Sequence, residues 1–203
     1  NGAHAHWWTF IAPFFLDHYR VAAIDLSGAG DSGHRDKYTP EVFAAEVAGV
    51  ADHAGFGNDT VVIGHSFGGT VALRLAVERP EMVRTLTLLE PVMMAVAKVD
   101  NPQVAAILAR DMNAFYHALA TGEKAQAAKI FTEFYGDGRP WDSLSDDGRN
   151  AIIDRIHLIG AFNGSPSFNE NVTILNLSPL LTTFSKTSSK ELLKVRFCSF
   201  LDS

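Results

Sequence analysis

Short apolar runs alternate with stretches of helical periodicity over the first 95 residues of the chain. Each apolar run ends at turn residues or at a proline, as buried strands do. This strand-to-helix alternation predicts a parallel sheet covered on both faces, which places the fold in the α/β class. The expected strands are Tyr19–Leu26, Thr60–Gly64 and Val83–Leu89, and two of the expected helices cover Trp7–Leu16 and Phe67–Arg79.

A third helix is expected from Thr39-Pro40-Glu41 onwards. Thr39 can cap the first turn, and Pro40 suits the first helical position because its missing N–H has no helical partner there. Gly55 and Gly57 mark the end of this helix.

The pattern changes to consecutive amphipathic helices over residues 96–160. They are expected at about 101–121, 123–135 and 143–160, with Asn101-Pro102 and Thr121-Gly122 between elements. A helical insertion after a strand of an α/β domain has two readings at this point. It is either a lid over the site or further helix that packs on the core.

Residues 165–203 form a third region of different composition. All 16 glycines lie at or before Gly164, whereas serine is concentrated in the tail. Such a shift indicates a linker, a decayed segment or an altered reading frame or splice product. Val172–Leu177 and Leu192–Phe200 retain enough apolar residues for either strand or helix.

Composition narrows the class of protein. The chain has 203 residues, is 47% hydrophobic and 20% charged, and carries a net charge of −6, which argues against a nucleic-acid partner. No apolar run reaches the roughly 18–20 residues of a membrane span, so no membrane partner is expected. With one cysteine, Cys198, a cytoplasmic setting is expected. Asn1 stands where an initiator Met is expected, which leaves a lost targeting segment open.

Candidate chemistry centres on Ser66. Gly64-His65-Ser66-Phe67-Gly68 fits G-x-S-x-G, with an apolar strand before it and a helix after it. The glycines keep Cβ atoms out of a tight turn that presents the serine hydroxyl above the sheet edge. The N-terminus of the following helix favours developing negative charge, and the N–H of Phe67 is a predicted oxyanion donor. No metal-ligand spacing and no dinucleotide loop is present, so neither metal nor cofactor is expected.

With the upstream loop Asp25–Ser32 (DLSGAGDS), this elbow resembles the α/β-hydrolase superfamily over roughly residues 1–164, most closely its cap-containing, bacterial-type serine hydrolases. The resemblance implies a mostly parallel sheet flanked by helices. It divides the chain into a core (1–95), a helical cap (96–164) and an atypical tail (165–203). Members include esterases, lipases, thioesterases, dehalogenases and epoxide hydrolases. Ser66 argues against the last two, which use an aspartate as nucleophile.

The segment Asn1–Trp8 is similar to the loop after the family's His-Gly oxyanion pair. The resemblance implies that this pair, its strand and two earlier strands precede Asn1, so that the sheet of this chain is incomplete and the chain is truncated at both ends. It also makes the N–H of Asn1 or Gly2 the second oxyanion donor. The residues expected near the substrate pocket are Trp7, Trp8 and His65, the last with elbow packing as its alternative.

The rest of a catalytic triad is open. In this fold the order is Ser, then Asp or Glu, then His. Only His117 and His157 follow Ser66, and both fall in the helical region. His157 is the candidate base, with packing in a cap helix as the alternative. Glu90, after the third strand, is the candidate acid.

The leading hypothesis is therefore a hydrolase of a small to medium ester or related carbonyl compound that works through an acyl-enzyme on Ser66. The alternative is an inactive remnant or fragment without a triad histidine, acting at most as a binding module. The expected partner is a small-molecule substrate, and the oligomeric state is open.

Overall fold

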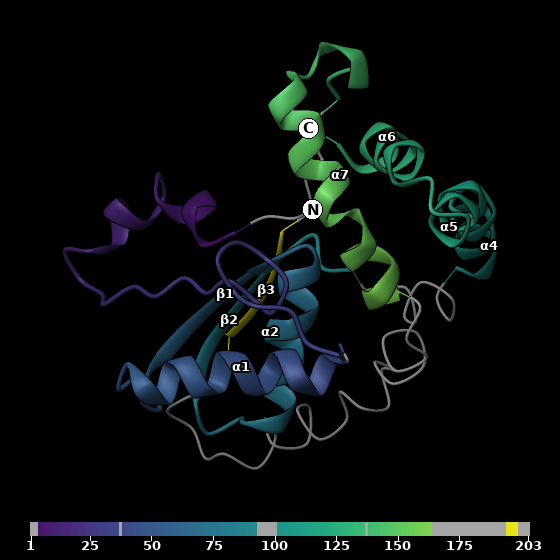
Figure 1. Ribbon diagram of the computed structural model, residues 1–203. Coiled ribbons are helices and arrows are strands. Elements are labelled where there is room, and N and C mark those ends of the chain that lie inside the picture. Colours follow the sequence, from purple (N-terminus) through teal and green to yellow (C-terminus); the bar gives the residue numbers. More distant parts are fainter. Residues whose placement is uncertain (1–3, 37, 93–100, 137, 164–193, 199–203) are drawn as a thin grey trace.

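A three-stranded parallel sheet forms the centre of the computed structural model, which describes residues 4–36, 38–92, 101–136, 138–163 and 194–198 (Figure 1). The strands are β1 (Thr60–His65), β2 (Val83–Leu89) and β3 (Lys194–Cys198), in the order β1-β2-β3. β1 and β2 confirm two predicted strands and the predicted parallel pairing. β3 shows that the stretch near residues 192–200 contains a strand, paired in parallel with β2. Val172–Leu177 lies outside the described residues.

The predicted strand Tyr19–Leu26 is wrong. This segment belongs to no sheet ladder, and Tyr19 and Val21 are 48% and 41% exposed. The described sheet has β1 at its edge, paired on one side with β2. An apolar run predicts burial, but a strand also needs a hydrogen-bonded neighbour, and the described residues supply none for this segment.

The predicted helix Trp7–Leu16 is also wrong. Two short 3₁₀ helices stand there instead, η1 (Ala5–Trp8) and η2 (Ala12–Phe15). Their hydrogen bonds join residues three apart, as from Trp7 N–H to the His4 carbonyl at 3.0 Å. Pro13 explains part of the difference, because a proline in this stretch has no N–H to donate to the carbonyl of Thr9.

Two helices pack against the sheet and one another. α1 (Pro40–His53) begins as predicted, with Val42 N–H donating to Thr39 Oγ1 at 3.3 Å. α2 (Phe67–Glu78) confirms the predicted helix after the elbow. The central core draws on both helices and β2, and its buried members are Ala44, Ala48, Ala51, Ala72, Leu73, Leu75, Ala76, Met82, Val83, Leu86 and Leu88.

The later helices form a group that we call the helical unit. It comprises α4 (Pro102–Asp111), α5 (Asn113–Ala120), α6 (Lys124–Tyr135), η3 (Trp141–Ser143) and α7 (Asp146–Asn163). The single helix predicted over 101–121 is two, because the chain bends at Met112. The unit has its own core, made of Met112, Phe115, Ala118, Ala127, Ala128, Phe131, Trp141, Ile156 and Ile159.

α7 joins this unit to the sheet region (Figure 1). Ile156 and Ile159 face the core of the helical unit, whereas Leu158 packs with Phe43 of α1 and Val71 of α2. Within the described part of the chain, no helix combines the length and apolar character needed to cross a membrane.

Candidate active site

Ser66 forms the tight connection between β1 and α2. Its backbone has φ 54° and ψ −123°, a region that residues other than glycine rarely enter. Neighbouring elements hold this conformation. Ser66 N–H donates to the Leu89 carbonyl of β2 at 2.9 Å, and the Ser66 carbonyl accepts from Gly69 N–H at 2.9 Å and from Val92 N–H at 3.3 Å. The observed turn is therefore the strained strand-to-helix connection that the sequence predicts.

The glycines of the elbow differ in how closely other atoms approach them. A Cβ on Gly64 would lie 2.5 Å from the Gly68 carbonyl oxygen, and one on Gly69 would lie 2.9 Å from Pro91 Cβ. By contrast, a Cβ on Gly68 would meet nothing within 4 Å. The expectation that both motif glycines clear a crowded turn holds for Gly64 and is wrong for Gly68. Gly69, just beyond the motif, is the second glycine that close packing requires.

Glu90 lies beside Ser66 at the carboxyl edge of the sheet. β1 and β2 pair in parallel with His65 opposite Leu89, so Ser66 and Glu90 are the first residues beyond two aligned strands. Glu90 is exposed and also has a positive φ, 45°. Reactive groups in parallel sheets gather at this end of the strands, and the acid role of Glu90 stays a prediction.

Phe67 begins α2, which puts its backbone N–H at the positive end of the helix. Its ring packs edge-on against Phe43, with centroids 5.3 Å apart, and Phe43 stacks on Tyr38 at 5.8 Å. The ring is thus partly in the core. The predicted oxyanion role concerns the backbone N–H of Phe67 and not its ring. The other two predicted donors, Asn1 and Gly2, lie outside the described residues.

The predicted pocket residues are dispersed. Trp7 is 57% exposed and Trp8 half-buried, both on η1, whose backbone bonds run to His4 and Ile11. Figure 1 shows this N-terminal stretch on the opposite side of the sheet from α5 and α6. His65 ends β1 beside Ser66 and is exposed. The structure thus brings Ser66, Phe67, His65 and Glu90 together, and a pocket role for the tryptophans stays a prediction.

His157, the predicted base, lies on α7 against the loop 28–38. Its ring centroid is 5.5 Å from that of His34, and its Nδ1 is buried with no hydrogen-bond partner. Burial lowers the pKa of His157, and the nearby positive charges of Lys124 and His34 act in the same direction, against the effect of the Asp154 backbone carbonyl. The base role is untested by these contacts and stays a prediction.

Asp25 organises the loop before α1, a role that the sequence reasoning missed. Its carboxylate accepts hydrogen bonds from the backbone N–H of Asp31, at 3.0 Å, and of Ala5. Partial burial opposes its ionisation, but these hydrogen bonds, with His4 and His6 nearby, lower the pKa of Asp25 overall. Gly30 lets the carboxylate fit, because a Cβ there would lie 2.0 Å from Asp25 Oδ2. The D-x-x-G-x-G spacing of the loop was the sequence signal that could have revealed this role of Asp25.

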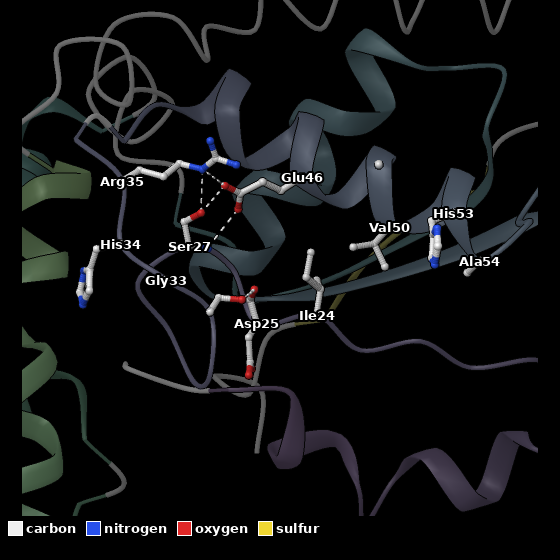
Figure 2. Close-up of a pocket in the computed structure, with 12 residues that line it drawn as sticks. Ile24, Asp25, Ser27, Gly33, His34, Arg35, Glu46, Val50, His53 and Ala54 are labelled. Carbon is white, nitrogen blue, oxygen red and sulfur yellow. Dashed lines mark hydrogen bonds and ion pairs between the residues drawn. The ribbon is translucent and has the colours of Figure 1, made fainter.

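A hollow lies between this loop and α1, and Figure 2 shows residues that line it. Its volume is about 630 Å³. A partly exposed polar network closes one end of it. Ser27 N–H donates to Glu46 Oε2 at 3.0 Å, and Arg35 Nε donates to Ser27 Oγ at 2.8 Å and to Glu46 Oε1 at 2.5 Å. These groups satisfy one another, and Ser66 does not line the hollow. The polar groups at the hollow therefore anchor the loop to α1.

Comparison with known proteins settles the family. The family model for the alpha/beta hydrolase fold matches residues 1–138. The chain belongs to the α/β-hydrolase fold family. Among the described residues of this α/β hydrolase, no group of three or more His, Cys, Asp or Glu is arranged to hold a metal ion.

Curated relatives of this α/β hydrolase include enzymes of more than one chemistry. It is 44% identical to lipase LipV of Mycobacterium tuberculosis over 71 residues, which cover 35% of this chain and 27% of the lipase. It is 37% identical to mouse epoxide hydrolase 4 over 75 residues, 36% of this chain and 21% of that enzyme. It is 32% identical to the pimeloyl-[acyl-carrier protein] methyl ester esterase of Neisseria meningitidis over 102 residues, 50% of this chain and 38% of the esterase. The matched regions thus span well under half of each relative.

Solved structures agree on the fold. The chain superposes on epoxide hydrolase CorEH with a TM-score of 0.66 at 19% identity, covering 97% of this chain and 71% of that one. An α/β hydrolase from Nostoc sp PCC 7120 gives a TM-score of 0.64 at 19% identity, covering 98% and 70%. The predicted α/β-hydrolase fold is confirmed, and the described residues form three strands of its sheet.

Proposed function

We propose that this α/β hydrolase cleaves small to medium carboxylic esters, with Ser66 as the nucleophile. The observation that carries the proposal is the backbone of Ser66, held at φ 54° between a parallel strand and the N-terminus of α2. Strain of this kind costs of order 1–3 kcal/mol and persists where the surroundings impose it, which is common at reactive residues. Ser66 lies at the carboxyl edge of the sheet, where substrates of α/β proteins bind.

The proposed reaction is acyl transfer. Ser66 Oγ attacks the carbonyl carbon of the ester while its proton passes to a general base. The resulting oxyanion is stabilised by the Phe67 N–H at the start of α2. Collapse of this intermediate breaks the bond to the alcohol, which leaves with the proton returned by the base. Water then attacks the acyl-serine, the acid departs, and Ser66 regains its proton.

The neighbours of Ser66 support this assignment to different degrees. The register of β1 and β2, which puts Glu90 beside Ser66, supports Glu90 as the acid of a triad. His157, whose described ring contact is with His34, is the proposed general base. Conversion of Glu90→Gln should then alter the pH profile of hydrolysis, whereas a structural role would change stability alone.

One residue, Ser66, favours ester cleavage over epoxide opening as the reaction. The curated relatives include a lipase, an esterase and epoxide hydrolases. The family resemblance gives epoxide hydrolases an aspartate as nucleophile, and this chain has Ser66 in that place. A serine forms the acyl-enzyme of ester hydrolysis, so the elbow residue favours the lipase and esterase relatives.

Covalent labelling tests the nucleophile. A fluorophosphonate forms a bond from phosphorus to an activated serine oxygen with loss of fluoride, and peptide mass analysis locates the adduct. We expect the label on Ser66 in the wild-type chain and in the Ser143→Ala control, which removes an exposed serine of η3. Absence of an adduct on Ser66, or equal labelling of the Ser66→Ala chain, would contradict the proposal.

A further inference from the structure

A series of ring contacts and one hydrogen-bond contact links the elbow to the helical unit. It begins at Phe67, which packs on Phe43, and Phe43 stacks on Tyr38 with an interplanar angle of 16°. The Tyr38 hydroxyl lies 3.0 Å from Nδ1 of His34, and the His34 ring faces that of His157 on α7. The contact between the two histidines is therefore where this series crosses from the loop 28–38 to the helical unit.

The crossing point is closely packed at Leu158, whereas the His34 ring is exposed and the His157 ring is half-buried. Leu158, next to His157, sits so close to Gly28 that a Cβ there would lie 2.7 Å from Leu158 Cδ2. The two imidazole rings are tilted by 33° at 5.5 Å between centroids. Nδ1 of His157 is buried and makes no hydrogen bond to the loop, and the polar group that acts on the ring is the backbone carbonyl of Asp154 on α7 itself, so packing holds the ring against the loop.

We propose that the His34–His157 contact is a pH-sensitive latch, which keeps α7 docked on the loop 28–38 while the His157 ring is neutral and releases it when that ring is protonated. Docking of α7 carries the rest of the helical unit with it, because Ile156 and Ile159 are part of that unit's core. The proposal concerns the attachment of the helices and does not depend on Ser66 being the nucleophile.

The groups around His157 make protonation unfavourable in the docked state. The loop contributes His34 with Tyr38, α6 contributes Lys124, and α7 itself contributes the Asp154 carbonyl, whose effect is the opposite. Burial adds to the effect of the positive neighbours and lowers the pKa of His157. The undocked state therefore binds protons more readily. Docking is strongest above the ordinary histidine value of roughly 6.5 and weakens as the pH falls below it.

Amide hydrogen exchange of the folded chain tests the latch. Exchange in the second half of α7 is compared at pH 7.5 and 5.5, after correction for the intrinsic pH dependence of exchange, with α2 amides as internal reference. Linkage to one histidine predicts that opening of α7 increases by about threefold or more at the lower pH, while α2 does not change. Equal protection of α7 at the two pH values would overturn the proposal.

Variants distinguish the proposed latch from a loss of stability of the whole protein at low pH. His157→Gln should abolish the pH dependence of α7 exchange, and His18→Gln, which changes an exposed histidine of the N-terminal stretch, should preserve it. Undiminished pH dependence in His157→Gln would overturn the proposal. If that variant does not fold, the NMR titration of His157 in His34→Gln serves instead. Removal of the facing ring should raise the His157 midpoint, and an unchanged midpoint would overturn the latch.

Discussion

Ser66 and Glu90 occupy matching positions beyond the paired strands β1 and β2, and each has a positive φ, 54° and 45°. In the described part of the chain they are the two residues other than glycine in this conformation. Backbone strain is thus concentrated at one point, the carboxyl edge of the sheet beside the N-terminus of α2. Strain that is kept in this way is typical of reactive sites.

Relief of that strain should stabilise the protein. Glycine adopts positive φ without a Cβ penalty, so Ser66→Gly should raise the free energy of unfolding by about 1 kcal/mol relative to Ser66→Ala. Both variants lack the hydroxyl, so the difference isolates the backbone. Denaturant unfolding of the two variants measures it. A Ser66→Gly chain less stable than Ser66→Ala would show that the elbow is not strained.

Gly64 and Gly68 provide a matched pair. Gly64→Ala should lower the free energy of unfolding by about 1–3 kcal/mol, because the new methyl group would meet backbone atoms of Gly68 and Gly69. Gly68→Ala places its methyl group in open space and should be neutral, or stabilising by roughly 0.4–1 kcal/mol through the unfolded chain. Thermal or denaturant unfolding distinguishes them, and equal losses would contradict the close packing at Gly64.

Asp25 should contribute to the acid sensitivity of the fold. Its pKa is lowered in the folded chain, so its stabilisation is present above the ordinary value of roughly 3.9 and is lost as the pH falls through the lower folded value. Asp25→Asn should therefore reduce the dependence of stability on pH between about 5 and 3. Asp17→Asn, at an exposed position, is the control. An unchanged pH dependence in Asp25→Asn would count against the hydrogen bonds from Asp31 and Ala5.

Local signals predicted the elements around the elbow. The apolar runs at Thr60 and Val83, the Thr39-Pro40 cap and the G-x-S-x-G spacing each describe an element that its own residues stabilise, and the structure contains all of them. The family followed from the same residues, because the elbow and the loop Asp25–Ser32 are contiguous in sequence.

Features that depend on contacts with residues far away in the chain could not be predicted from the sequence. Tyr19–Leu26 has the composition of a strand but no described neighbour to pair with, and periodicity carries no information on pairing. The difference between Gly64 and Gly68 depends on which backbone atoms approach each glycine. Likewise, the contact of His157 with His34 joins segments more than a hundred residues apart, so spacing along the chain does not reveal it.

Hydrolysis of p-nitrophenyl butyrate by the chain and its Ser66→Ala variant tests the central claim most directly. If Ser66 is the nucleophile, the wild-type chain turns over the ester and Ser66→Ala loses activity by about 10³-fold or more. The circular dichroism of the two proteins should be the same, which confirms that the loss is chemical. A Ser66→Ala chain that hydrolyses the ester as fast as the wild type, or a folded wild-type chain with no hydrolysis, would contradict the assignment.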